Sequence, residues 1–342
     1  MKRVLLGVLA LVVVAALAAA ALVWWIDSTV RKSSPTLTEP VVLVIEQGSS
    51  LNRIARQLDN AGVLSSRDAF ILYARYRGVS QLIRAGEYEM TPGITGLEVL
   101  DKLVAGDVYL HSVTLVEGWT FREALAALQT HPAIRSTQDP ERPDQTMAQL
   151  GYPDTHPEGR FFPDTYRFER DSTDLQLLRV ALERMNLELD LAWARHDPDL
   201  PLETPDELLI LASIIEKETA LDTERREIAG VFVRRLEKKM RLQTDPTVIY
   251  GLGPSFDGNL RRRDLSTDTP YNTYTRHGLP PTPICLPGRE SLQAAADPAP
   301  GTALYFVATG NPDGSHYFSE TLEEHNAAVA RYLKQLKKSG NR

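Results

Sequence analysis

The sequence predicts an α+β chain in three parts: an N-terminal transmembrane helix, a small α+β module and a larger mixed α/β domain around a buried helix. Three observations lead to this prediction. The chain opens with a long apolar run, a strand–helix–helix–strand pattern follows, and the remainder combines amphipathic helices with one nearly all-apolar segment, Leu208–Ile215. At 342 residues the chain is long enough for two domains, or for one domain and a membrane element.

The run Val4–Ile26 predicts the transmembrane helix, because its 23 residues suffice to cross about 30 Å of hydrocarbon. Lys2, Arg3 and the terminal amine precede the run, and Trp24 and Trp25 stand at its far end, where interfacial aromatic residues are common. We therefore expect residues 1–30 to form a cytoplasmic stub and a membrane anchor, with the rest of the chain outside. A cleaved signal peptide is the alternative, since Ala-x-Ala patterns occur at Ala15–Ala21.

Residues 31–110 are expected to form a linker and the small module. The linker is the Pro/Ser/Thr-rich stretch Ser33–Pro40. The expected elements are a strand at Val41–Ile45, a helix carrying Leu51, Ile54, Ala55 and Leu58, a helix from Ser66 or Arg67, a strand at Ala85–Met90 and a helix at Thr95–Ala105. This order resembles the LysM-like fold, a glycan-binding module, although any small α+β spacer would show the same pattern.

The third domain is expected to span residues 111–342, with its boundary near Asp107–Ser112. The expected elements are a strand beginning at Val113–Leu115, a helix from Phe121, a long helix at Asp174–Arg195 and a helix at about Thr223–Lys239 with its Arg, Glu and Lys residues outward. The polar, Pro-rich stretch Thr130–His156 shows no sustained period and is expected to be a surface excursion.

The nearly all-apolar segment predicts a buried helix. Thr204 is the expected N-cap, Pro205 the first helical residue, and Glu207 completes a Thr-x-x-Glu capping box. Two acidic residues, Glu216 and Glu218, follow the apolar body.

Glu218 is the candidate catalytic acid in this helix. It lies seven, four and three residues after Leu211, Ile214 and Ile215, so a helix places it on their apolar stripe. Desolvation there would raise the pKa of its carboxyl, as a general acid near neutral pH requires. A charged, solvated helix end is the alternative. Glu216 would point about 160° away from Glu218, because successive residues are about 100° apart, and we expect a structural role for it.

Composition and motifs exclude several other functions. The net charge of −7 argues against a nucleic-acid partner. Cys285, the single cysteine, excludes an internal disulfide and sits in the loop TPICLPG without a nearby base. No phosphate-binding loop, dinucleotide fingerprint, zinc-protease motif or G-x-S-x-G elbow is present, and the histidines have no ligand spacing. We therefore expect neither a metal nor a cofactor.

Two downstream segments have the composition of a saccharide cleft. Sugar-binding sites combine aromatic rings that cover a sugar face with amides and hydroxyls that bind its polar groups. The candidate substrate-binding residues are Gln243, Thr244, Asp245, Tyr250, Asn272, Tyr274 and Thr275. Rigid turns whose side chains bind the backbone would show the same composition.

Several long motifs together resemble the endolytic murein transglycosylase (YceG-like) family. They are LASIIEKETA, RLQTDPTVIYG, DTPYNTYTRHGLPPTPICLPG, ALYFVA and HYFSETLEEHN, with matches also at Glu158–Tyr166 and Val116–Trp119. Thr282, Cys285 and Leu286 depart from the Pro-rich motif. The resemblance implies that Glu218, the acidic residue before Thr in E-K-E-T, is catalytic.

The resemblance implies an inner-membrane, single-pass protein whose periplasmic domain cleaves the MurNAc-β-1,4-GlcNAc bond within peptidoglycan strands. Glu218 would act as acid and then as base, and 1,6-anhydro-MurNAc ends would remain. Association with peptidoglycan synthases is also implied. Two alternatives stay open: a glycan-binding scaffold that recruits synthases without catalysis, and a muramidase-type hydrolase with Asp245 as its second carboxylate.

Overall fold

The computed structural model describes residues 2–34 and 36–339 and divides the chain into two compact units. The first unit contains the residues up to His111 together with Arg167–Asp171, and the second contains Ser112–Tyr166 and the residues from Ser172 onward. Met1 and Pro35, which fall in the expected membrane flank and linker, lie outside the described residues, as do residues 340–342 of the expected third domain.

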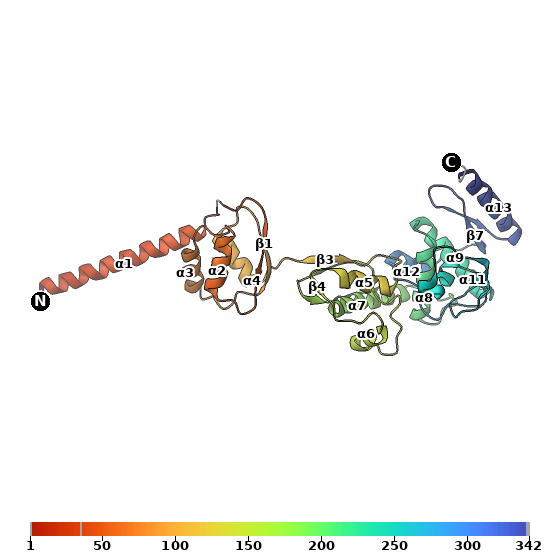
Figure 1. Ribbon diagram of the computed structural model, residues 1–342, viewed down its shortest axis with the longest axis horizontal. Coiled ribbons are helices and arrows are strands. Elements are labelled where there is room, and N and C mark those ends of the chain that lie inside the picture. Colours follow the sequence, from red (N-terminus) through yellow and green to blue (C-terminus); the bar gives the residue numbers. More distant parts are fainter. Residues whose placement is uncertain (1, 35, 340–342) are drawn as a thin grey trace. The chain divides into compact units, whose positions relative to one another are not determined.

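The first unit is an α+β module preceded by a long helix (Figure 1). Its elements are α1 (Lys2–Val30), β1 (Val41–Ile45), α2 (Leu51–Asn60), α3 (Arg67–Tyr76), β2 (Gly86–Met90) and α4 (Gly96–Ala105). β1 and β2 pair antiparallel, with Val41 opposite Met90 and Ile45 opposite Gly86. The strand and helix predictions for this module are therefore confirmed.

Helix packing explains why this short module has a core. Ile54, Leu58, Phe70 and Leu100 of the three short helices are buried with Tyr88 of β2 in one apolar cluster. The expected linker also takes part, which its Pro/Ser/Thr composition did not indicate. Leu37 is buried, and the Thr36 hydroxyl donates a hydrogen bond to the Gly62 carbonyl (3.0 Å).

Helix α1 is long and apolar enough to cross a membrane. Arg3–Val30 is the candidate span by length and composition, and its apolar side chains from Val4 to Trp25 are exposed. A signal sequence would meet the same criteria of length and hydropathy. The helix is therefore consistent with the expected membrane anchor and also with a cleaved signal peptide.

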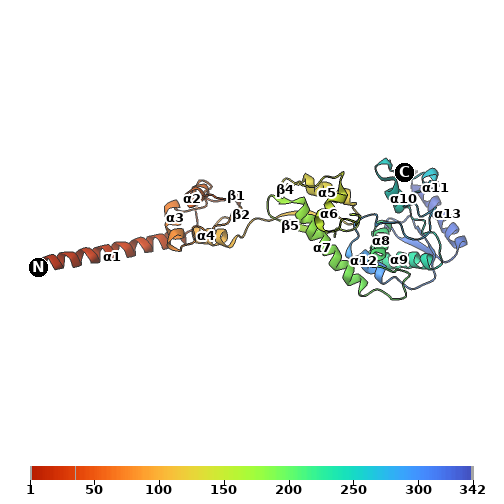
Figure 2. The ribbon, with the colours of Figure 1, turned by 90° about the horizontal axis from the view of Figure 1, so that it is seen from below.

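The second unit is mainly helical and holds short strand pairs (Figure 2). Its helices are α5 (Phe121–Thr130), α6 (Pro143–Leu150), α7 (Asp174–Trp193), α8 (Pro205–Glu218), α9 (Asp222–Glu237), α10 (Asp245–Leu252), α11 (Arg262–Ser266), α12 (Arg289–Ala296) and α13 (Leu322–Ser339), with a 3-10 turn at Gly253–Ser255. Its strands are β4 (Ile134–Arg135), β6 (Ser172–Thr173), β7 (Tyr305–Ala308) and β8 (His316–Ser319). The division between the units runs through β3 (His111–Thr114) and β5 (Thr165–Phe168), which pair with each other.

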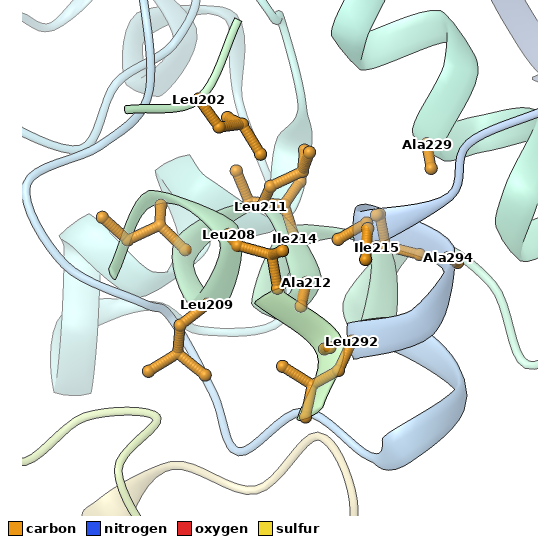
Figure 3. Close-up of a cluster of buried hydrophobic side chains, with 14 of the residues drawn as sticks. Leu202, Leu208, Leu209, Leu211, Ala212, Ile214, Ile215, Ala229, Leu292 and Ala294 are labelled. Atoms are coloured by element: carbon orange, nitrogen blue, oxygen red, sulfur yellow. The ribbon is translucent and has the colours of Figure 1, made fainter. Parts of the chain in front are cut away.

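Helix α8 lies at the centre of the larger core, as its apolar sequence predicts. Leu208, Leu211 and Ile215 are fully buried, and Figure 3 shows them beside Ala229 of α9 and Leu292 of α12. The Thr204 hydroxyl accepts the N–H of Glu207 (3.2 Å), so the N-cap is confirmed. The predicted capping box is wrong in its second hydrogen bond. The Glu207 carboxylate accepts the N–H of Glu203 and not that of the N-cap residue Thr204.

One prediction about a loop is corrected by the structure. Thr130–His156 is not a surface excursion: β4 and α6 form within it, and Ile134, Met147 and Leu150 are buried. The apolar residues of α6 are too few for the periodic pattern to emerge from a Pro-rich context. The Pro/Gly/Tyr-rich stretch after Arg241 also contains regular structure, since Asp245–Leu252 forms α10 with Pro246 in its first turn.

Candidate active site

Glu218 is the last residue of α8, and its carboxyl lies against the apolar core. The next residue, Thr219, is extended (φ −146°, ψ 140°) and ends the helix. Leu211, Ile214 and Ile215 are buried on the stripe below it. The predicted position of Glu218 on the apolar stripe is therefore confirmed.

The environment of this carboxyl favours its neutral form. Burial raises the pKa of Glu218 to about 7, and the negative charge of Asp245 acts in the same direction. A hydrogen bond from the Thr244 hydroxyl to Glu218 Oε1 opposes the shift, as do the more distant His316 and Arg235. A carboxyl with a pKa near 7 is populated in both protonation states at neutral pH, as a group that must give and then take a proton requires.

Thr244 is held in place by backbone strain at Gln243 and by several hydrogen bonds around it. Gln243 has a positive φ of 52°, which is unusual for a residue with a side chain, and its N–H donates to the Thr273 carbonyl (3.2 Å). The Thr244 N–H donates to the Thr273 hydroxyl (3.1 Å), and Thr247 donates to the Thr244 carbonyl (2.8 Å). Backbone strain of this kind persists where surrounding contacts over-determine the conformation, often at functional sites.

Arg235 of α9 fixes the same segment from the other side, and the sequence analysis missed it. Its side chain is buried, and its guanidinium donates to the carbonyls of Leu304 (2.6 Å), Arg241 (3.1 Å) and Leu242 (2.8 Å). Arg235 was expected to face outward. It lies seven, four and three residues after Ile228, Val231 and Phe232, so its place on their buried stripe was the signal that could have found it.

These groups surround a pocket of about 490 Å³ in the second unit. The pocket is lined by Glu218, Arg235, Leu242, Gln243, Thr244, Asp245, Tyr274, Tyr305, Phe306, Val307, Leu322, His325 and Asn326. Its volume falls in the range of small-ligand sites. Aromatic rings, amides, a hydroxyl and carboxyls therefore converge in one concavity beside Glu218.

Four of the seven candidate substrate-binding residues lie in this pocket: Gln243, Thr244, Asp245 and Tyr274. The Tyr274 hydroxyl donates to Asp245 Oδ1 (2.5 Å), and burial raises the pKa of Tyr274. These two side chains form a fixed polar pair in the pocket.

The other three candidates do not line this pocket. Asn272 is fully buried, and its amide donates to the carbonyls of Asp264, Leu265 and Thr267, so it braces a turn and is not available to sugar hydroxyls. Thr275 donates to Asp268 (2.8 Å). Tyr250 donates to Glu158 (3.0 Å) and packs edge-on against Tyr271. The side chains of these three residues stabilise turns and packing within the protein, as the alternative to sugar binding expected.

Glu216 and Cys285 occupy structural positions on the opposite side of α8. The Glu216 carboxylate accepts the N–H of Gly288 (2.9 Å) and the Ser291 hydroxyl (2.8 Å), so it binds the N-terminus of α12. Cys285 is buried and its thiol donates to the Ser213 carbonyl (3.2 Å). The atypical Pro-rich segment is thereby attached to the middle of α8.

A larger hollow, of about 800 Å³, lies between α7, α9 and α12, yet it is a weaker candidate for the reaction site. Three of its arginines are already paired, since Arg184 and Arg289 both contact Glu188, and Arg226 contacts Asp297. Glu218 does not line it. In the described part of the chain, no group of three or more His, Cys, Asp and Glu side chains is placed to hold a metal ion.

Comparison with known proteins places the whole arrangement in one family. The model of the YceG-like family matches residues 43–331, a range that extends into both units and contains every residue of the Glu218 pocket. The chain belongs to the YceG-like family.

Two bacterial relatives are named endolytic murein transglycosylases. The endolytic murein transglycosylase of Bacillus subtilis is 34% identical over 322 residues, covering 89% of this chain and 87% of the relative. That of Streptococcus pneumoniae strain R6 is 28% identical over 331 residues, covering 86% of this chain and 58% of the longer relative. The crystal structure of a YceG-like protein from Listeria monocytogenes is similar in fold, with a TM-score of 0.54, 31% identity, and coverage of 84% of this chain and 99% of that one.

Proposed function

We propose that this protein is an endolytic lytic transglycosylase that cleaves the MurNAc-β-1,4-GlcNAc bond within peptidoglycan strands, with Glu218 as its catalytic residue. The single observation that carries the proposal is the Glu218 carboxyl, whose pKa burial raises to about 7, in a pocket of saccharide-binding character. Family membership and the names of the relatives support the substrate class.

Glu218 performs both proton transfers of the reaction. Protonated Glu218 donates its proton to the glycosidic oxygen while the bond to C1 of the muramic residue breaks. The resulting carboxylate takes the proton of the C6 hydroxyl of the same residue, and that oxygen bonds to C1 to close a 1,6-anhydro ring. The carboxyl ends protonated, no water is consumed, and the 2-acetamido group of the substrate can stabilise the positive charge at C1.

One carboxyl suffices for this route, whereas a hydrolase of the usual kind uses two. Asp245 is the nearest candidate for a second, but it accepts a hydrogen bond from Tyr274 and acts on Glu218 by charge. We assign Asp245 to substrate binding and to raising the pKa of Glu218.

The N-terminal parts of the chain would position this chemistry at the cell wall. Helix α1 would anchor the protein in the inner membrane by a single span, with the catalytic domain, residues 111–342, in the periplasm. The module of residues 31–110 would act as a LysM-like glycan-binding unit, and peptidoglycan synthases are the proposed protein partners.

Digestion of purified peptidoglycan by the wild type and by Glu218→Gln tests the proposal. The wild type should release fragments with 1,6-anhydro ends, and the variant should release none. In the scaffold alternative the variant would keep the cellular phenotype, while deletion of Pro40–Gly106 would lose it. Full cleavage by Glu218→Gln would exclude Glu218 as the acid.

A further inference from the structure

His325 reaches the Glu218 pocket from the C-terminal helix, far from Glu218 in sequence. It lies in the first turn of α13, where its N–H donates to the Thr321 carbonyl (3.1 Å), and its imidazole forms part of the pocket wall. Ala328, one turn later on the same face, is buried against the unit. The position of His325 is therefore set by the packing of α13.

The imidazole of His325 and the guanidinium of Arg235 both pack on the Tyr305 ring. The Arg235 guanidinium lies over the Tyr305 ring, 5.0 Å from its centroid. The His325 ring stacks on Tyr305, with centroids 5.3 Å apart and planes inclined by 26°. Arg235 itself is fixed by three backbone carbonyls, so this packing holds His325 at a defined place in the pocket.

The ring is held in place, but its nitrogens form no hydrogen bond with the residues that the structure describes. His325 Nδ1 is shielded from solvent, and neither ring nitrogen has a hydrogen-bond partner among residues 2–34 and 36–339. Burial lowers the pKa of His325, and the positive charge of Arg235 lowers it further, so the ring is neutral at physiological pH. A neutral imidazole with Nδ1 shielded offers Nε2 to the pocket.

The other histidines of this chain behave differently. His316 Nδ1 contacts the Glu224 carboxylate (2.7 Å), and His277 Nδ1 contacts the Lys239 carbonyl (3.0 Å). The remaining four also have a partner for a ring nitrogen: His111, His131, His156 and His196. Since a buried polar group without a partner costs free energy, a histidine serving only to support the fold would be expected to have one, as these do.

We propose that His325 is a substrate-binding residue, whose Nε2 forms a hydrogen bond with a hydroxyl or acetamido group of the sugar held beside Glu218. The proposal rests on the assignment of the Glu218 pocket as the glycan site. It adds His325, which lies in the motif HYFSETLEEHN but was not among the candidate substrate-binding residues, and it gives the packing of Arg235 and His325 on Tyr305 a function.

Binding measured without turnover tests this proposal. In the Glu218→Gln protein, titration with a purified tetrasaccharide of alternating GlcNAc and MurNAc gives Kd by calorimetry. Adding His325→Phe keeps a ring on Tyr305 but removes the nitrogens, and Kd should rise about five- to tenfold, as expected for one hydrogen bond. His325→Gln restores an amide near the position of Nε2 and should recover part of the affinity. The matched control, His277→Phe, changes an exposed histidine and should leave Kd unchanged.

Two readouts separate binding from a structural role. The Tm of His325→Phe should equal or exceed that of its parent, since the substitution removes a shielded nitrogen without a partner. In the unsubstituted ring, the ¹⁵N signal of Nε2 should shift when the tetrasaccharide is added. An unchanged Kd in His325→Phe, or an Nε2 signal that does not move on saturation, would overturn the proposal. Cleavage by Glu218→Gln would instead overturn the proposed function, so the two failures are distinguishable.

Discussion

The Thr244 hydroxyl donates a hydrogen bond to the Glu218 carboxylate across 26 residues of sequence. This bond joins the end of α8 to the start of α10 at the point where the half-buried carboxyl of Glu218 meets the pocket. It stabilises the ionised form of Glu218 against burial, which favours the neutral form. The balance of these two effects leaves the pKa of Glu218 near 7. Substitution of the residues around the carboxyl should therefore shift this pKa.

Removing the Thr244 hydroxyl should move the pH profile of the enzyme to higher pH. Because the acid must be protonated at the start of the cycle, kcat/KM should fall with an apparent pKa of about 7 in the wild type. Thr244→Val removes a hydrogen bond to the ionised form, so the pKa of Glu218 rises and the descending limb should shift upward by about one pH unit. Thr302→Val, which removes a hydroxyl that donates to the Glu320 carboxylate outside the pocket, is the control and should leave the limb in place. If the descending limb of the pH profile stays at the same pH in Thr244→Val, the account is contradicted.

Substitution of Asp245 distinguishes the lytic route from hydrolysis by a carboxylate pair. The negative charge of Asp245 raises the pKa of Glu218, so Asp245→Asn should lower that pKa and move the descending limb to lower pH. The asparagine oxygen can still accept from Tyr274, and activity at pH 6 should stay within about tenfold of the wild type. A muramidase using Asp245 as its base would lose about 10³-fold in kcat. The measurement is kcat/KM across pH for both proteins.

Arg235 should be required for activity beyond its contribution to stability. Arg235→Met loses three hydrogen bonds to carbonyls and should cost about 2 kcal/mol in the free energy of unfolding. It should also lower kcat about tenfold or more, since the segment carrying Gln243 and Thr244 loses its support. Arg234, the next residue, donates to the carbonyls of Ala303 (2.7 Å) and Ala299 (3.1 Å) and does not line the pocket. Arg234→Met should therefore lose stability but keep kcat, and equal loss of kcat in both variants would refute the positioning role.

Glu158 should make the protein less stable as pH rises toward 8. Burial raises the pKa of Glu158 to about 7, although the Phe121 N–H and the Tyr250 hydroxyl both donate to it. Its pKa in the unfolded chain is lower, near 4.5, so its favourable contribution is complete below that pH and is lost as pH rises through 7. The loss approaches about 3 kcal/mol, because one pKa unit corresponds to about 1.4 kcal/mol.

Urea denaturation at pH 5, 6, 7 and 8 measures this dependence. Glu218 has a similarly raised pKa and contributes in the same direction. Glu158→Gln should reduce the fall in unfolding free energy between pH 5 and pH 8 by about half, and the double variant with Glu218→Gln should reduce it further. A wild type that becomes more stable over this range would show that both carboxyls ionise readily in the folded state.

Local sequence was sufficient to predict the helix that carries the site. Thr204 and Pro205 mark the start of α8, and the apolar body with Glu218 on its stripe follows from helix geometry alone. Thr244, Asp245 and Tyr274 were found by composition, because their residue types are those of a saccharide pocket.

Residues whose environment comes from distant segments were not predicted. The local period places Arg235 on the buried stripe of α9, but its partners Leu304 and Tyr305 lie about 70 residues later in the chain, and no local period can reveal them. His325 enters the pocket only because α13 packs against the unit. The prediction for Asn272 was wrong for the opposite reason. An asparagine is a suitable residue type for sugar binding, but its amide donates to backbone carbonyls five to eight residues before it.

The most direct test of the central claim is product analysis in H₂¹⁸O. Purified peptidoglycan is digested with the wild-type protein, with Glu218→Gln, and with Glu216→Gln as the control for a glutamate on the other side of α8. Mass spectrometry of the new muramic ends then identifies the bond that was cleaved. The presence or absence of ¹⁸O shows whether water or the C6 hydroxyl was the nucleophile. We predict 1,6-anhydro ends without ¹⁸O from the wild type and from Glu216→Gln, and no new ends from Glu218→Gln. Reducing ends that carry ¹⁸O, or anhydro ends released by Glu218→Gln, would contradict this account.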